Sequence, residues 1–404
     1  MSETKSGVLQ RRLNLPLLVL YGTGVTIGAG IYVLIGAVAA HAGQYAPLAF
    51  VMAALVMGLT VGSYAELCTR YPVAAGEVAY VKAAFRVRWL SMLTGLMMIT
   101  AGLVATATVA LGATGYIGQF IAIPRPLVVV VIVVALGLVA AWGILESVLL
   151  ASLFTLIEIG GLVAIVVAAV HADIPFGGAL LKLPPIGAPV WAGIALASLL
   201  AFFAFIGFEN LTTVVEESHQ PERNVPLAMA ITLIVTTVLY VMVAAIAITA
   251  VPLSELAADP APLSLVYRNV AGVGQTTISL IAIVATLNTI IAQMTMATRV
   301  IYGMARLGDL PKALGHVHGR TSTPLRATAV TTAAVLLLAL VIPFETLAET
   351  TSISALIVFA MVNLALIKLR MWDRVPRHGG VHVPIIVPMI GFASCVVMIL
   401  SSML

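Results

Sequence analysis

Charged residues are scarce in this sequence. They make up 9% of the 404 residues, whereas soluble domains carry about 25%. Hydrophobic residues make up 61%, and apolar stretches of about 20 residues recur along the chain, which is the length an α-helix needs to cross a bilayer. The scarcity of charge excludes a soluble domain, and the length of the stretches disfavours a β-barrel, whose strands are shorter. The sequence therefore predicts an all-α integral membrane protein that has the lipid bilayer as a partner.

Cysteine and histidine are missing from the places where a disulfide or a cofactor would need them. The two cysteines, Cys68 and Cys395, lie in different apolar stretches, and nothing suggests a disulfide. All seven histidines fall in loops or at the edges of the stretches, which argues against haem ligation. No nucleophile–base pair or metal-ligand cluster occurs at depth in the stretches, and the basic residues are spread over loops. We therefore expect no enzymatic activity, no metal, no cofactor and no nucleic-acid partner.

The apolar stretches predict eleven transmembrane helices. Their expected ranges are 15–40, 46–68, 90–120, 127–144, 147–170, 190–214, 227–251, 273–302, 326–343, 350–369 and 383–403. We expect a cytoplasmic N-terminal tail (1–14), two five-helix blocks (15–170 and 190–369) and an additional C-terminal helix (383–403). Residues 70–89 carry four basic residues, and we expect them to form an amphipathic cytoplasmic segment rather than a span.

Basic residues orient the expected helices. With the N-terminus in the cytoplasm, seventeen of the twenty Lys and Arg residues fall on the cytoplasmic side. Only Arg125, Lys182 and Arg268 fall outside. Cytoplasmic loops of membrane proteins carry such an excess of basic residues. We therefore expect a multi-pass protein of the cell (inner or plasma) membrane with a cytoplasmic N-terminus.

Glycine is concentrated in the first expected helix. The stretch "GTGVTIGAGIY" (22–32) holds four glycines, and a glycine inside a helix costs about 0.5–1 kcal/mol relative to alanine. The sixth expected helix has a matching interruption at Gly207, in "FFAFIGFEN" (202–210). Backbone groups freed by such breaks are tolerated at membrane depth only where they meet a ligand or line a cavity. The alternative is that small residues, such as Gly24 and Gly28, only let helices pack closely.

The two interruptions lie five expected helices apart. Because five is odd, the two five-helix blocks would sit in opposite orientations in the membrane. Paired interruptions in inverted repeats point to the midplane binding site of a transporter. The sequence thus favours an inverted five-plus-five helix repeat.

Four motifs carry a resemblance to a known family. They are "GAGIYVLIG" (28–36), "YAELCTRYPVAAGEVAYVKAAF" (64–85), "FFAFIGFENLTTVVEESHQPERNVP" (202–226) and "TRVIYGMARLGDLPKALGHVHGRTSTP" (298–324). In this order they resemble motifs of the amino acid–polyamine–organocation (APC) superfamily. The resemblance implies the inverted repeat of the LeuT-like fold and secondary transport of amino acids or related amines. Many members have twelve helices, whereas the stretches here predict eleven.

The same resemblance places the substrate site at the two interruptions. Backbone N–H groups of the first would meet a carboxylate, and carbonyl groups of the second would meet an amine. The expected substrate-binding residues are Thr26, Ile27, Gly28, Ala29, Gly30, Phe203, Ala204, Phe205, Ile206 and Gly207. The rings of Phe203 and Phe205 would gate the site or stack on the substrate, although we expect one of them to pack in the core or against lipid. Many relatives have serine at the position of Ala29, so a hydroxyl contact is missing here.

Two acidic residues, Glu158 and Glu209, lie inside the expected helices, where a charge costs about 2.5–3.5 kcal/mol to insert. Glu158 shares a small and polar stripe with Thr155 and Gly161. No basic residue occurs at its depth, so its protonated form is favoured and we expect a proton carrier. The alternative is a permanently neutral glutamate that is hydrogen-bonded between helices. Several family members carry at the matching position a lysine that is thought to replace a sodium ion.

Glu209 matches a position at which some relatives carry a glutamate implicated in proton coupling. It would alternatively cap the second half of the sixth helix, because an acid near a helix N-terminus is favoured by about 0.3–1 kcal/mol. Asn288 is a further polar residue at depth, in "ATLNTIIAQM" (285–294). We expect it to hydrogen-bond either the site or a neighbouring helix, and we favour the neighbouring helix.

Together these features predict a proton-coupled permease that moves amino acids by alternating access. The resemblance implies that spans 1 and 6 rock against a scaffold of spans 3, 4, 8 and 9. Two membrane carboxylates would suit a cationic amino acid or a polyamine, whereas the mostly apolar pocket would suit a neutral amino acid, which we favour. The alternatives are an exchanger of polyamines or cationic amino acids without proton coupling, and a channel, since broken helices also line pores. The sequence leaves the oligomeric state open.

Overall fold

The computed structural model describes residues 13–72, 76–142, 148–185, 187–272, 275–318, 321, 323–372 and 380–402. These residues form helices joined by turns, and among them there is no β-strand beyond an isolated bridge between Leu13 and Ser218. The predicted all-α class is confirmed. Most of the expected cytoplasmic tail (1–14) lies outside the described residues.

The helices of the first half are α1 (Leu15–Ile27), α2 (Gly30–Ala42), the 3-10 turn η1 (Gly43–Tyr45), α3 (Ala46–Arg70), α4 (Gly76–Phe85), α5 (Arg88–Ile117), α6 (Arg125–Trp142), α7 (Val148–His171) and α8 (Gly177–Leu180). Those of the second half are α9 (Ala188–Phe203), the 3-10 helix η2 (Phe208–Glu217), α10 (Pro221–Ala250), α11 (Leu253–Ala258), α12 (Pro262–Ala271), α13 (Gln275–Leu307), η3 (Lys312–Gly315), α14 (Leu325–Val341), α15 (Phe344–Trp372) and α16 (Ile386–Ser401).

Several helices begin where the sequence supplies a capping residue or a proline. At the start of α1 the side chain of Asn14 accepts a hydrogen bond from the backbone N–H of Leu17 at 3.1 Å, which satisfies a donor that a helix start leaves free. Proline stands in the first turn of α1, α3, α9, α10 and α12. At this position the missing N–H of proline breaks no helical hydrogen bond. The helices α1, α3 and α9 therefore start within two residues of the expected boundaries, whereas α10 starts at Pro221, before the expected 227, and α12 was not expected as a separate helix.

Within the described residues, eight helical runs are long and apolar enough to cross a membrane, by length and composition. One of them is the continuous run of α2, η1 and α3. The apolar helices α1, α14 and α16 are shorter, with 13, 17 and 16 residues. All the expected spans overlap these helices, and the number of membrane crossings stays a prediction.

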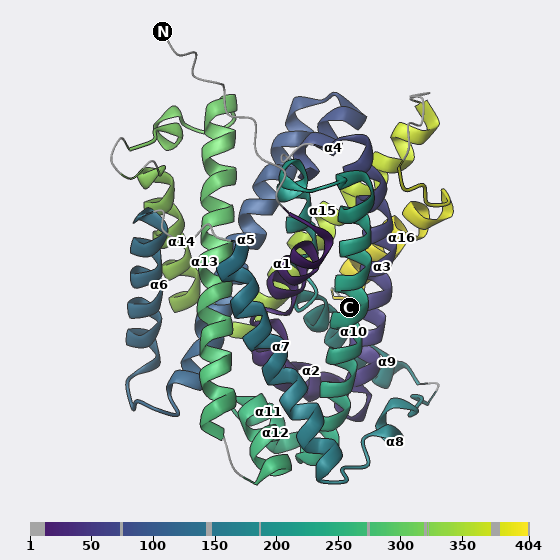
Figure 1. Ribbon diagram of the computed structural model, residues 1–404, viewed down its shortest axis with the longest axis vertical. Helices are drawn as coiled ribbons and strands as arrows, with labels where there is room; N and C mark the ends of the chain where they lie inside the picture. The colour runs from purple at the N-terminus through teal and green to yellow at the C-terminus, as the bar shows by residue number, and fades with distance from the viewer. Residues whose placement is uncertain are drawn as a thin grey trace.

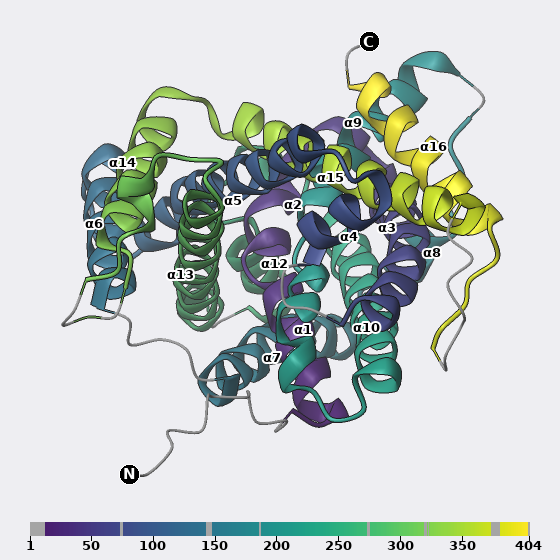
Figure 2. The same cartoon turned by 90° about the horizontal axis from the view of Figure 1, so that it is seen from above.

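The two interrupted helices occupy the centre of the bundle (Figure 1). α1 packs against α7, α10 and η2, and α2 packs against α9, so the first broken helix contacts the second. α3, α5, α10, α13 and α15 lie around them (Figure 2). α6 and α14 lie side by side at one edge of the bundle, and α16 packs on α15 and α3 at the opposite edge. Whole helices therefore separate the broken segments from the lipid-facing surface.

The short helices α11 and α12 close one end of the bundle, the lower end in Figure 1. Their backbone comes very close to two other helices. An added Cβ at Gly115 of α5 would lie 1.9 Å from the carbonyl oxygen of Pro260, and one at Gly36 of α2 would lie 2.8 Å from that of Leu256. Leu256 and Leu263 are fully buried. This is the end that the charge distribution predicts to face the outside of the cell.

The helix α4 lies at the opposite end of the bundle (Figure 1). It has 10 residues, too few to cross a bilayer, and it falls inside the segment expected to be amphipathic and cytoplasmic (70–89). Its Glu77 is 2% exposed and accepts a hydrogen bond from the hydroxyl of Tyr64 at 3.0 Å. Burial raises the pKa of Glu77 above its ordinary value, because a desolvated carboxyl favours its neutral form.

A buried ion cluster ties α3 to α15. The carboxylate of Glu66, which is 1% exposed, pairs with the guanidinium groups of Arg70 and Arg370. It also accepts the backbone N–H of Val383 at 3.0 Å and lies 3.3 Å from Nδ1 of His382. A buried carboxylate is tolerated when its charge and lone pairs are matched in this way. The cluster holds the segment that leads into α16 against the bundle.

Replacing Gly115 by alanine is expected to destabilise the protein, because the new methyl group would overlap the carbonyl of Pro260. Overpacking of this kind costs about 1–3 kcal/mol. Gly160 of α7 is the matched control, since nothing lies within 4 Å of an added Cβ, and Gly160→Ala should leave stability unchanged or raise it. Thermal unfolding of the two purified variants in detergent measures the difference. Equal unfolding temperatures would contradict the close approach of α5 to the α11–α12 segment.

Candidate functional site

Both interruptions expected from the sequence are present in the structure. Residues 28–29 separate α1 from α2, and residues 204–207 separate α9 from η2. The backbone φ angle is 30° at Gly28 and 141° at Gly207, a range that residues with a Cβ rarely adopt. Each break therefore contains a glycine that lets the chain leave the helix.

The two breaks contact each other through their backbones. An added Cβ at Gly207 would lie 2.6 Å from the carbonyl oxygen of Val25. One at Gly30 would lie 2.6 Å from the Cα of Ala204. Neither distance leaves room for a side chain, so each glycine makes space for the other broken segment.

Gly24, by contrast, serves helix packing. An added Cβ there would lie 1.7 Å from Oγ1 of Thr155 on α7. Gly161 lies on the same face of α7, and its added Cβ would lie 2.6 Å from the hydroxyl of Tyr32. The small and polar stripe of α7 thus packs against the first broken helix. The interpretation that small residues permit close packing applies to Gly24, whereas Gly28 lies in the break.

Tyr240 of α10 links the two breaks. Its hydroxyl lies 2.9 Å from the carbonyl oxygen of Ala204 in the second break, and 3.1 and 3.2 Å from those of Thr26 and Ile27 in the first. The side chain is fully buried. A hydroxyl has only one hydrogen to donate, so three carbonyl oxygens compete for it. These carbonyls have lost their helical partners at the breaks, and Tyr240 gives them a shared donor.

A small pocket lies between the breaks and three whole helices. Its lining from the first broken helix consists of Val25, Thr26, Gly28, Ala29 and Gly30. Its other lining residues are Phe203 and Ile206 of the second broken helix, Ala105 of α5, Thr289 and Gln293 of α13, and Thr351 of α15. None of these side chains is ionisable. The described residues also hold no cluster of three or more His, Cys, Asp or Glu side chains able to bind a metal ion.

The pocket is narrow, and a hydrogen bond holds two of its sides together. Its volume is about 20 Å³, room for about one water molecule. The backbone N–H of Ala29 donates to Oγ1 of Thr289 at 3.0 Å, and that hydroxyl donates to the carbonyl of Ala285 at 2.9 Å. The first break is thereby fastened to α13. A ligand larger than water requires the surrounding segments to move apart.

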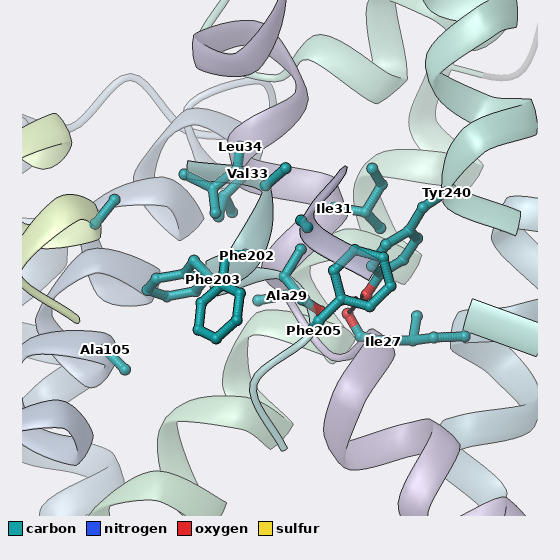
Figure 3. Close-up of a cluster of buried hydrophobic side chains, with 14 of the residues drawn as sticks. Ile27, Ala29, Ile31, Val33, Leu34, Ala105, Phe202, Phe203, Phe205 and Tyr240 are labelled. Carbon is teal, nitrogen blue, oxygen red and sulfur yellow. Dashed lines mark hydrogen bonds between the residues drawn. The ribbon is translucent and has the colours of Figure 1, made fainter. Parts of the chain in front are cut away.

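The structure brings most of the expected binding residues to this pocket. Those that line it are Thr26, Gly28, Ala29, Gly30, Phe203 and Ile206. Those that do not are Ile27, Ala204, Phe205 and Gly207, all of which are buried in packing. The two phenylalanines also differ, because Phe203 lines the pocket and Phe205 does not. Figure 3 shows Phe202 and Phe203 on the side of Ala105, and Phe205 beside Tyr240, with a distance of 5.1 Å between the ring centres of Phe205 and Tyr240.

Sequence reasoning missed several residues of the site. They are Tyr240, which links the breaks, and the pocket residues Val25, Ala105, Thr289, Gln293 and Thr351. For Tyr240 and Gln293 a signal was present, since each is a polar group inside an apolar span and such groups need a partner or a cavity. Ala105 gave no signal, because alanine is common on every face of a membrane helix.

Glu158 and Asn288, singled out separately in the sequence, contact each other. The amide Nδ2 of Asn288 on α13 donates to Oε1 of Glu158 on α7 at 3.1 Å. The other carboxyl oxygen, Oε2, is buried and has no hydrogen-bond partner among the described residues. The backbone carbonyl of Glu158 accepts the hydroxyl of Tyr32 at 2.7 Å. Asn288 therefore binds a neighbouring helix, and Glu158 keeps one oxygen without a donor.

Glu209 lies in the first turn of η2, beside the second break. Its Oε2 accepts the backbone N–H of Gly207 at 2.8 Å. Its own carbonyl accepts the hydroxyl of Thr212 at 2.7 Å. The contact with Gly207 satisfies a backbone donor that the break would otherwise leave free, which is the kind of contact expected of a capping acid.

A helical membrane bundle with a pocket between two broken central helices is the architecture of secondary transporters. The family model described as "Amino acid permease" matches residues 13–404, almost the whole chain. The chain therefore belongs to the amino acid permease family, within the APC superfamily.

Three relatives illustrate the range of the family. The chain is 30% identical to the branched-chain amino acid permease BcaP of Bacillus subtilis, over 90% of this chain and 81% of that protein. It is 28% identical to the vacuolar cationic amino acid transporter 2 of Arabidopsis thaliana, over 90% of this chain and 60% of that longer protein. It is also 27% identical to a methylthioribose transporter of B. subtilis, over 91% of this chain and 83% of the relative. The substrates named for these proteins are neutral, cationic and sugar-like.

Removing the hydroxyl of Tyr240 is expected to loosen both breaks. Tyr240→Phe keeps the ring but deprives three buried carbonyl oxygens of their shared donor, a loss of about 1–3 kcal/mol. Backbone amides in peptides that cover 22–32 and 200–210 should then exchange hydrogen faster, which mass spectrometry detects. Tyr45→Phe is the control, because the hydroxyl of Tyr45 bonds only the exposed side chain of Gln44. Unchanged exchange in Tyr240→Phe would contradict the role of Tyr240 at the breaks.

Proposed function

We propose that this chain is a secondary active transporter that carries amino acids by alternating access and is coupled to protons. One observation carries the proposal: a pocket opens at the meeting point of two broken helices in a member of the amino acid permease family. Its partners are then an amino acid and the lipid bilayer. The bacterial permease among the relatives and the distribution of basic residues support the cell membrane, with a cytoplasmic N-terminus.

The helix ends at the pocket supply groups for both charged ends of an amino acid. α2 begins at Gly30, beside the pocket, and the N–H groups of a helix start favour a carboxylate. α1 and α9 end there, and the carbonyls of a helix end favour an ammonium group. The N–H of Ala29, now bonded to Thr289, would pass to the substrate carboxylate when the pocket widens.

Transport requires the pocket to open to each side in turn. In the present conformation the pocket is too small for an amino acid, α11 and α12 close the outer end, and α4 packs against η2 at the other. The breaks provide the flexible points, because the half-helices on either side are joined by two to four non-helical residues. α1 and η2 then tilt as units relative to α2 and α9, in keeping with a hinge-type motion.

Glu158 is the first candidate for the proton-coupling group. It is joined to Asn288, and the next residue of α13, Thr289, holds the N–H of Ala29 in the pocket. A proton that binds the unpartnered oxygen of Glu158 therefore acts beside Asn288. Asn288 precedes Thr289, which holds the N–H of Ala29 in the pocket. Glu209 is the second candidate, because its carboxylate bonds the N–H of Gly207 in the other break.

The alternative function is an exchanger of cationic amino acids or polyamines without proton coupling, in line with the plant relatives. The pocket weighs against it, because no acidic side chain lines it. A cation transferred to such a site leaves water without gaining a counter-charge.

Proton coupling is tested by uptake of radiolabelled amino acids into proteoliposomes, with and without an inward proton gradient. Wild type should show gradient-stimulated uptake. Glu158→Gln keeps the bond to Asn288 but cannot ionise. The proton gradient should therefore stimulate uptake by this variant about tenfold less than uptake by wild type, while substrate binding and counterflow are kept. Glu209→Gln runs in parallel, and Glu345→Gln is the control, since Glu345 is exposed in the first turn of α15 and does not line the pocket.

The outcomes separate the two acids and the two functions. Loss of stimulation in Glu209→Gln alone would move the coupling role to Glu209. Uptake that ignores the gradient in every variant would refute proton coupling and favour an exchanger. Absence of uptake and binding for every amino acid would refute the proposed function itself.

A further inference from the structure

Gln293 is the polar side chain on the whole-helix side of the pocket for which the described residues provide no partner; on the side of the first broken helix the buried hydroxyl of Thr26 also lacks one. It lies on α13, lines the pocket and is 7% exposed. Its amide makes no hydrogen bond to any described residue. The hydroxyls of Thr289 and Thr351, in contrast, donate to the carbonyls of Ala285 and Leu347 at 2.9 Å each. Among the lining residues of the whole helices, Gln293 is therefore the side chain with both a donor and an acceptor to spare.

An unpaired amide is costly at this depth. Leaving a buried polar group without a hydrogen bond costs about 1–3 kcal/mol, and an amide can use two donors and two acceptor sites. Gln293 is held one helical turn from Thr289, on the same side of α13, so its position in the pocket is fixed by the helix. Such a group is satisfied when a ligand in the pocket bonds to it.

The two sides of the pocket differ in what they offer. The broken helices offer backbone groups, which suit the carboxylate and ammonium that every amino acid carries. Ala105, Gln293 and Thr351 come from the whole helices α5, α13 and α15, and they meet whatever projects from the substrate toward those helices. With its backbone groups at the breaks, the side chain of an amino acid is what projects there.

The side chains that the whole helices present to the pocket exclude two of the substrate types named for the relatives. A lysine or arginine side chain would find no acid among the lining residues, and an uncompensated charge is the most costly group to bury. A leucine or valine side chain would leave the amide of Gln293 unpaired. Resting on the proposed function, we infer that the site takes neutral amino acids with a hydrogen-bonding side chain, carboxamides first, and that Gln293 is the residue that selects them.

Carboxamides fit best because two amides can exchange two hydrogen bonds, each donating its N–H to the carbonyl of the other. A serine or threonine hydroxyl forms a single bond and ranks second. A site that hydrogen-bonds its substrate discriminates strongly against analogues without the bonding group, because its own polar group is then left unpaired.

The test is competition for uptake in proteoliposomes, with glutamine, asparagine, serine, leucine and lysine as competitors. Wild type should prefer glutamine to leucine by about tenfold or more, and lysine should compete least. Gln293→Leu replaces the amide by an apolar group of similar size. In this variant glutamine should compete for uptake about tenfold less well than in wild type, whereas leucine should compete equally well or better. Gln293→Glu keeps the shape and adds an acid, and it should raise competition by lysine. Gln44→Leu is the control, because Gln44 is exposed and bonds Lys182 and Tyr45 far from the pocket.

The results distinguish a failure of this inference from a failure of the proposed function. If wild type neither carries nor binds any amino acid, the proposed function is refuted, and the inference is refuted with it. If amino acids are carried but leucine or lysine is preferred, the inference alone is overturned. An equal loss for all substrates in Gln293→Leu and Gln293→Glu, with both variants folded, also overturns it, because that pattern marks a structural residue.

Discussion

The direct contact between two broken helices is the constraint on which the rest of the structure depends. Gly30 lies against the backbone of Ala204, and Gly207 lies against the backbone of Val25, at distances that exclude side chains. In lipid, a helix can be interrupted only where its freed N–H and C=O groups find other partners. Bringing the two interruptions together lets the hydroxyl of Tyr240 serve carbonyl groups of both, and α7 and α10 pack against them.

The polar side chains of the bundle fall into two groups once this contact is in place. Tyr240, Thr289 and Glu209 bond backbone groups at the breaks and so stabilise the interruption. Gln293, the hydroxyl of Thr26 and the second oxygen of Glu158 keep hydrogen-bonding capacity that the described residues do not use. The first group explains how the breaks persist, and the second consists of the groups that the proposals above assign to a substrate and a proton.

Under the proposed function, the same architecture would account for the different amino acids named for the relatives. The backbone groups at the breaks are indifferent to the substrate side chain, because they meet only what all amino acids share. Under the proposed function, specificity would then rest on a few positions of the whole helices, here Ala105, Gln293 and Thr351. A change at one of these positions would alter the preferred amino acid without disturbing the breaks, which suits relatives named for branched-chain and for cationic amino acids.

The sequence by itself determined the all-helical membrane class, the two interruptions and the family motifs. These are local properties: the scarcity of charge, the length of apolar stretches, and glycines whose positive φ no other residue adopts easily. Only the tertiary structure decided that Phe203 lines the pocket while Phe205 packs on Tyr240, and that Asn288 bonds Glu158. A membrane helix is apolar toward both lipid and core, so its pattern does not reveal which face turns inward. The rotation of each helix, and with it the identity of Gln293 and Tyr240 as site residues, follows from packing between segments far apart in the chain.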